Sequence, residues 1–135
     1  MSTEQRRMLD TNLLVRYFTG TPADQHQKAV AVMDGEGPLW LSVITILETA
    51  HVLLRIYEIP REQVVDALTD LLRRRNIHTC ELPRQRVIDA LALCRPSARV
   101  SFGDALSWAR AAEDGAEVVT FDQRFPGHEI TLTVL

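Results

Sequence analysis

Short apolar runs alternate with longer segments of helical periodicity along the 135-residue chain. Strands are expected in the runs at residues 7–9, 39–41, 77–80, 117–120 and 129–135. Strands that are separated by helices normally pair in parallel through right-handed crossovers, with helices on both faces of the sheet. The pattern therefore predicts an α/β fold with a mostly parallel, five-stranded sheet. The first strand is expected near its centre and the fifth at an edge.

Turn and capping residues mark where the helices begin and end. Helices are expected over about residues 13–18, 21–35, 42–57, 60–75, 83–94 and 102–114. Ser42 and Ser101 are suited to cap two of them, and Gly20 to end the first. No repeat, low-complexity tract or long linker interrupts the series, and the length suits one ordinary domain. We therefore expect a single domain over residues 1–135.

The composition argues against a membrane protein or an exported one. The longest nearly apolar stretch, residues 39–47, contains Ser42 and Thr45 and is too short to span a bilayer. Charged residues interrupt the N-terminal stretch, which therefore lacks the apolar centre of a signal peptide. Cys80 and Cys94 have no zinc-site spacing and are expected to be buried free thiols. These features predict a cytoplasmic protein with no membrane partner.

Four acidic residues occupy similar places relative to the predicted strands. They are Asp10 after the first strand, Glu48 in the helix after the second, Asp104 at the start of a late helix, and Asp122 after the fourth strand. The carboxyl ends of parallel strands meet at one edge of a sheet, so acids from distant segments can converge there. Carboxylate oxygens are ligands that hard cations such as Mg²⁺ prefer. The arrangement predicts a site for a divalent metal ion.

Each acid also has a local structural interpretation. Asp10 and Asp122 could cap the helix and the turn that follow them. Glu48 could be solvated, or it could pair with an arginine in the polar stripe of its helix. Asp104 stands three residues after Ser101, the spacing of a capping box. Chance alone is a weaker explanation for all four acids near one sheet edge, so the metal site is favoured for the set.

The sequence around these acids resembles the four acidic motifs of PIN-domain ribonucleases. The matching segments are LDTNLL at 9–14, LETA at 47–50, FGDA at 102–105 and VVTFD at 118–122. Their order and spacing match as well, and the resemblance covers about residues 7–135. The small size is similar to that of VapC-type toxins of bacterial toxin–antitoxin pairs. The resemblance implies a PIN-like nuclease domain.

The resemblance also implies roles for individual residues. Metal coordination and catalysis are implied for Asp10, Glu48, Asp104 and Asp122, and polar support for Asn12 and Thr120. Asp10 and Asp104 would hold the principal Mg²⁺ or Mn²⁺ ion, Glu48 would bridge or position water, and Asp122 would complete a weaker second site. Metal-activated water would hydrolyse RNA to leave 5′-phosphate and 3′-hydroxyl ends. The implied partners are RNA, a cognate antitoxin and a second copy of the chain in a homodimer.

Charge and motif details leave two other functions open. The net charge of −3 becomes +1 without the four acids, so a surface that meets RNA phosphates is compatible with the composition. The basic run Arg73-Arg74-Arg75 could contact RNA, or it could complement a helix dipole. A catalytically silent PIN-like binding module would use all four acids as caps or surface groups. An aspartate-dependent phosphotransfer protein fits less well, because Lys28 is the only lysine.

Overall fold

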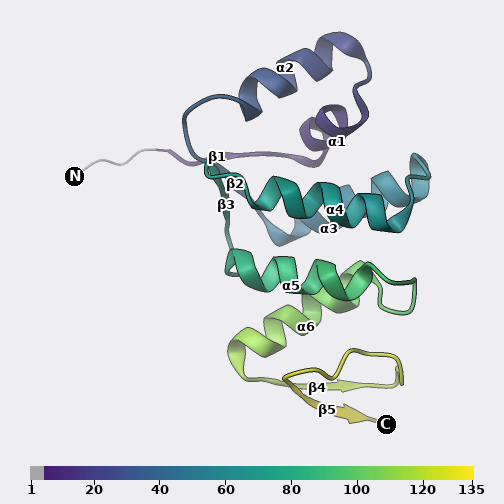
Figure 1. The fold of residues 1–135 in the computed structure, drawn as a ribbon. Helices are drawn as coiled ribbons and strands as arrows, with labels where there is room; N and C mark the ends of the chain where they lie inside the picture. The colour runs from purple at the N-terminus through teal and green to yellow at the C-terminus, as the bar shows by residue number, and fades with distance from the viewer. Residues whose placement is uncertain (1–4) are drawn as a thin grey trace.

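The computed structural model describes residues 5–135, which fold into strands and helices in the alternating order that the sequence predicts (Figure 1). In chain order the elements are β1 (Arg7–Met8), α1 (Thr11–Thr19), α2 (Ala23–Met33), β2 (Leu39–Leu41), α3 (Val43–His51), η1 (Val52–Ile56), α4 (Arg61–Leu72), β3 (Ile77–Thr79), α5 (Arg84–Cys94), α6 (Phe102–Asp114), β4 (Glu117–Thr120) and β5 (Thr131–Val134). All strand pairs are parallel. The α/β class is therefore confirmed.

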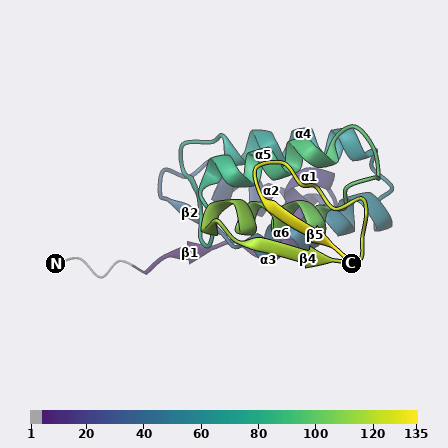
Figure 2. The same ribbon diagram turned by 90° about the horizontal axis from the view of Figure 1, so that it is seen from below.

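The strands form two sheets, so the prediction of one five-stranded sheet is wrong. One sheet has the order β1-β2-β3, and the other consists of β4 and β5. β1 is consequently an edge strand and not a central one. Helices α5 and α6 lie between the two sheets in Figure 1, in place of helices on both faces of a single sheet. Figure 2, from below, shows the β4–β5 pair lying across α6.

Helix α6 explains why the sheet divides. It packs mainly along α5 and also against α3. Gly115 then takes a left-handed conformation, with φ of 63°, and turns the chain back so that β4 runs beneath α6. The short β1, with only two residues, is left on the other side of the helices. The position of β4 thus follows from helix packing and not from the apolar character of the strand.

The helix ends follow local signals in the sequence. Ser42 and Ser101 cap α3 and α6 by accepting hydrogen bonds from the amides of Thr45 at 3.2 Å and Asp104 at 3.0 Å. Gly20 ends α1 in a left-handed conformation, with φ of 78°. These three predicted boundaries are confirmed.

The helix expected over residues 42–57 changes geometry partway. α3 ends at His51, and η1 continues as a π-helical turn in which the amide of Tyr57 donates to the carbonyl of Val52 at 3.2 Å. A π-helical turn holds an extra residue within an otherwise regular helix. Apolar periodicity in the sequence does not reveal such a turn, because an α-helix and a π-helical turn both keep an apolar side towards the core.

The core lies between the three-stranded sheet and its neighbouring helices, and it continues between α5 and α6. Leu39 and Leu41 of the central strand β2 are 1% and 0% exposed. Phe102 and Trp108 of α6 belong to the same buried cluster. This packing fixes α1, α3 and α6, the three helices at or within which Asp10, Glu48 and Asp104 stand.

Two further sequence expectations concern the cysteines and membranes. Cys80 and Cys94 are free thiols, as expected, but only Cys94 is buried, whereas Cys80 is partly exposed. Within residues 5–135, none of the helices has the length and apolar character needed to cross a bilayer.

Candidate functional site

The end of β1 and the middle of α3 bring two of the four acids together. Thr11 donates a hydrogen bond from its hydroxyl to Oε2 of Glu48 at 2.9 Å. Asp10 directly precedes Thr11, so both carboxylates lie at the start of α1, and both residues are exposed. Oδ1 of Asp10 accepts a hydrogen bond from the amide of Leu13 at 2.9 Å. Asp10 is therefore a helix cap, and its second oxygen has no hydrogen bond among the described residues.

Asp104 lies in the first turn of α6, a helix that packs beside α3. Its amide is bound by Ser101, but its partly exposed carboxylate makes no hydrogen bond within residues 5–135. The full reciprocal capping box is therefore not formed. Burial raises the pKa of the Cys94 thiol to about 11, and the negative charge of Asp104 adds to that increase while Arg61 opposes it. Asp104 is therefore near enough to the end of α5 for its charge to act on that thiol.

Asp122 lies after β4 in a tight turn. Its Oδ1 accepts a hydrogen bond from the amide of Arg124 at 2.8 Å, and its own amide donates to the hydroxyl of Thr120 at 3.0 Å. The hydroxyl of Thr120 therefore helps to hold the turn that contains Asp122, two residues further along the chain. Asp122 is exposed and acts as a turn cap, which is the alternative interpretation of this residue.

Asn12, the other predicted supporting residue, is exposed on the first turn of α1. It lines a surface pocket between α1 and α2, together with Arg16 and Gln25. That pocket involves α2 and not α3, so Asn12 has no contact with Glu48 comparable to that of Thr11.

The structure does not gather all four carboxylates at one point. Within the described part of the chain, no group of three or more His, Cys, Asp or Glu side chains is placed to hold a metal ion. Asp122 follows β4, and α5 and α6 lie between the β4–β5 pair and β1 (Figure 1). The expected convergence was argued from one continuous sheet, so a shared metal site of all four acids stays a prediction.

The remaining pair has the donor chemistry of a magnesium ligand set. Mg²⁺ keeps several water molecules and is commonly bound through one or two carboxylates together with substrate phosphates. Asp10 supplies an exposed carboxylate at the start of α1. The hydrogen bond from Thr11 holds the exposed carboxylate of Glu48, which comes from α3, at the same place. The residues present therefore fit a partly hydrated hard cation.

A groove between α3 and α6 lies next to this pair. Its volume is about 360 Å³, and Leu47 and Gly103 line it. These residues are the sequence neighbours of Glu48 and Asp104, although neither acid lines the groove itself.

Two residues of this region were absent from the predicted set. Thr11 links the first two acids, and Glu81 lines the groove, where its carboxylate accepts a hydrogen bond from the amide of Val43 at 2.8 Å. The only sequence signal for Thr11 is its place beside Asp10. Glu81 follows the third predicted strand closely, as the other acids follow theirs, and that position could have identified it.

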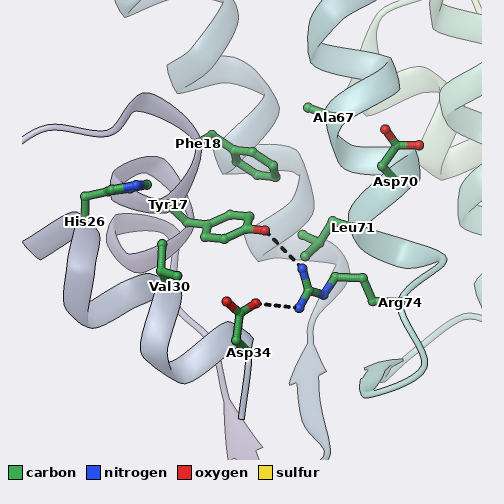
Figure 3. Close-up of a pocket in the computed structure, with 9 residues that line it drawn as sticks. All are labelled: Tyr17, Phe18, His26, Val30, Asp34, Ala67, Asp70, Leu71 and Arg74. Carbon is green, nitrogen blue, oxygen red and sulfur yellow. Dashed lines mark hydrogen bonds and ion pairs between the residues drawn. The ribbon is translucent and has the colours of Figure 1, made fainter.

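A larger cavity, of about 510 Å³, lies between α1, α2 and α4 (Figure 3). None of the four candidate metal ligands lines it. Arg74 reaches across it and donates hydrogen bonds to the hydroxyl of Tyr17 at 3.1 Å and the carboxylate of Asp34 at 2.9 Å. It also donates to the carbonyl oxygen of Met33 at 3.0 Å. Arg74 therefore ties α4 to the α1–α2 pair, a structural role that differs from both the RNA and the dipole interpretations of the basic run.

Comparison with known families gives one result that bears on this geometry. The family model for the PIN domain matches residues 7–129, a span that includes all four acidic positions. A comparison with curated proteins gave no match. Proteins with PIN domains are generally nucleases, and they typically depend on metal ions. The extent of the match shows that the chain belongs to the PIN domain family.

Proposed function

We propose that this PIN-domain protein is a metal-dependent endoribonuclease, the toxin component of a bacterial toxin–antitoxin pair. The observation that carries the proposal is the hydrogen bond between Thr11 and Glu48, which holds Glu48 beside Asp10 within a nuclease-type domain. Hydrolysis of RNA would leave 5′-phosphate and 3′-hydroxyl ends. The whole chain, residues 1–135, would form the nuclease domain.

Asp10 and Glu48 form the proposed nucleus of the metal site. Oδ1 of Asp10 caps the N-terminus of α1, which leaves Oδ2 for an Mg²⁺ or Mn²⁺ ion. Thr11 binds Oε2 of Glu48, and Oε1 has no hydrogen bond among the described residues. A bound divalent ion lowers the pKa of water and offsets the charge on a reacting phosphate.

Asp104 and Asp122 are proposed as the other two carboxylates of the site. Asp104 stands in the first turn of α6, which packs against α3, and would share the principal metal ion with Asp10. Asp122 would complete a weaker second site, with Thr120 holding its turn and Asn12 adding a polar contact.

The proposed partners are RNA, an antitoxin and a second copy of this chain. An antitoxin with a basic segment would neutralise the exposed acids and block the site. The proposed location is the cytoplasm, where the RNA substrates of such a toxin lie.

Cleavage by purified protein tests the enzymatic part of the proposal. We expect RNA to be cut with Mg²⁺ or Mn²⁺, to remain intact with a chelator, and to yield 5′-phosphate ends that a phosphatase can remove. Glu48→Gln should abolish cleavage, whereas Glu62→Gln, a matched change at an exposed acid of α4, should not. Equal activity of the two variants would contradict the role of Glu48.

Growth tests address the toxin part separately. Expression of the protein alone should slow growth, and co-expression with the adjacent gene should restore it. Normal growth with abundant folded wild-type protein would reject the toxin role and leave the nuclease activity to the cleavage assay.

A second candidate is a catalytically silent PIN-like binding module. It is favoured by two observations: Asp10 and Asp122 act as caps, and no group of three acids is assembled among the described residues. RNA binding without cleavage under all metal conditions would support this candidate over the nuclease.

A further inference from the structure

One face of the three-stranded sheet carries a row of stacked side chains. The strand register places Met8, Trp40 and His78 side by side on β1, β2 and β3. The rings of Trp40 and His78 are stacked, with centroids 4.8 Å apart and an interplanar angle of 27°. From the β1 side, the guanidinium carbon of Arg6 lies 3.9 Å from the centroid of the Trp40 ring. The result is a continuous Arg6–Trp40–His78 stack, which we call the stacking row.

The stacking row is open to solvent. Met8 is 52% exposed, Arg6 is exposed, and Trp40 and His78 are only partly buried. A cavity of about 400 Å³ adjoins Trp40, and its lining includes Arg6 and Arg7. A large aromatic ring on an uncovered sheet face thus faces a hollow with two positive charges.

The charges of this hollow are not neutralised within the fold. Arg6 and Arg7 form no salt bridge with any side chain in residues 5–135, whereas Arg74, Arg86, Arg95 and Arg110 all do. Both arginines are exposed. A polyanion would therefore meet two guanidinium groups that have no acidic partner among the described residues, one of them stacked on Trp40.

We propose that this face binds a single-stranded segment of RNA, with one base stacked on Trp40 and neighbouring phosphates on Arg6 and Arg7. Aromatic side chains within a basic groove are the combination that binds single-stranded nucleic acid with little sequence preference. A base presents a larger flat surface to Trp40 than a guanidinium does. Arg6 precedes β1, so it can leave the ring and cover the outer face of the base, with a cation–π contact retained.

The stacking row lies close enough to Asp10 and Glu48 for one RNA strand to reach both places. β1 and its flanking residues lead from Arg6 to Asp10 in an extended conformation, a path of about 13 Å at the rise of a β-strand. β2 leads in the same direction from Trp40 to Ser42, the cap of the helix that carries Glu48. An RNA strand that lies along β1 would be held at the stacking row and reach the Asp10–Glu48 pair a few nucleotides further on. The inference rests on the proposed function in this one respect, that RNA is the ligand.

RNA binding in the presence of a chelator tests the inference without catalysis. The probe is oligouridylate or oligoadenylate of about ten nucleotides, within the site size of known stacking surfaces. Trp40 and Trp108 are the two tryptophans of the chain, and Trp108 is 2% exposed. Saturable quenching of tryptophan fluorescence should therefore report stacking on Trp40.

Matched variants separate stacking from charge. Trp40→Leu should weaken binding of labelled RNA by roughly tenfold or more, while Trp40→Phe, which keeps a ring, should bind nearly as wild type does. Arg6→Ala and Arg7→Ala should each lower the slope of log affinity against log salt concentration by about 0.7. Lys28→Ala, which removes one positive charge from the exposed surface of α2, should leave affinity unchanged.

Three outcomes would overturn the inference. The first is equal RNA affinity of Trp40→Leu and wild type, and the second is quenching that persists in Trp40→Phe. The third is that the Trp40→Leu variant differs from wild type in oligomeric state but not in RNA affinity. That result would assign this face of the sheet to contact with a second copy of the chain. If Trp40→Leu is unfolded by circular dichroism, the Arg6 and Arg7 salt slopes decide instead.

Repeating the binding measurements with Mg²⁺ in place of the chelator, and following cleavage of the same RNA, keeps this inference distinct from the proposed nuclease. RNA that binds at Trp40 but is never cut would reject the nuclease and retain the stacking row. RNA that is cut equally well by wild type and a folded Trp40→Leu variant with unchanged affinity would retain the nuclease and reject the stacking row.

Discussion

The two sheets of this protein are built from similar short apolar strands but have different surroundings. In β2, Leu39 and Leu41 are almost fully buried, whereas Val119 in β4 is 57% exposed. β2 has a strand on each side, while β4 has one strand partner and lies against α6. Apolar composition therefore does not decide whether a strand belongs to the core; its neighbours do. The acids also differ in their contacts: Thr11 links Glu48 to the start of α1 beside Asp10, whereas Asp122 caps the turn after β4.

Polar contacts and one aromatic ring hold the β4–β5 sheet to the helices. Trp108 donates from its indole nitrogen to the carbonyl oxygen of His128. Arg86 bridges Glu113 at 3.1 Å and Glu129 at 3.0 Å, and Phe125 is 9% exposed within the core. A two-stranded sheet is marginal by itself, so these contacts maintain its position.

The Asp104→Asn substitution should have the largest effect on RNA cleavage. It tests whether α6, which carries Asp104, acts together with the Asp10–Glu48 pair. If Asp104 shares the metal ion with Asp10, the variant should lose roughly 100-fold or more of its RNA cleavage rate, because a charged ligand of the reacting centre is removed. Asp24→Asn, a matched change in the first turn of α2, should cleave as wild type does. Full activity of Asp104→Asn would show that the Asp10–Glu48 pair works without the second region.

Truncation of one apolar residue in each sheet compares their contributions to stability. Leu41→Ala should lower the free energy of unfolding by about 3 kcal/mol, because it opens a cavity in the core. Val119→Ala should change it by less than about 0.5 kcal/mol, because the side chain is mostly exposed. Urea denaturation of both variants measures the two changes. Similar losses would contradict the contrast between β2 and β4.

Cys94 tests the burial between α5 and α6 through pH. Burial raises its pKa from 9.0 to about 11, so the folded protein keeps the thiol proton at pH values where the unfolded chain releases it. The stabilising contribution is therefore complete below pH 9 and is lost as the pH rises through 11. The loss should be roughly 2 kcal/mol. Urea denaturation of wild type and Cys94→Ala between pH 8 and pH 11 measures it. Parallel curves for the two proteins would indicate that this thiol does not titrate differently on folding.

Arg86→Ala should give the smallest effect, confined to one region. Removal of its contacts with Glu113 and Glu129 should speed amide hydrogen exchange several-fold in β4 and β5 and leave β2 unchanged. Arg95→Ala, which removes the exposed pair with Asp66, serves as the control. Faster exchange in β2 would mean that the two sheets unfold as one unit.

The sequence allows the local features of this fold to be predicted, but not the long-range ones. Ser42, Ser101 and Gly20 act within one turn of their own helix, so residue type and spacing suffice to place them. The division of the sheet depends on how α6 packs against α5, a contact between separate segments that periodicity does not specify. Thr11 was missed for a related reason, since its partner Glu48 is 37 residues away.

Thermal melting with a metal titration tests the central claim, that Asp10 and Glu48 hold a divalent ion, most directly. Asp10→Asn keeps a capping side chain, because Asn caps helices as well as Asp does. In chelator, wild type and Asp10→Asn should therefore melt at nearly the same temperature. With Mn²⁺ at 100 times its dissociation constant, wild type should gain about 2.7 kcal/mol of stability, whereas Asp10→Asn should gain much less. An equal response of both proteins to Mn²⁺ would show that Asp10 is a helix cap alone and would contradict the proposed metal site.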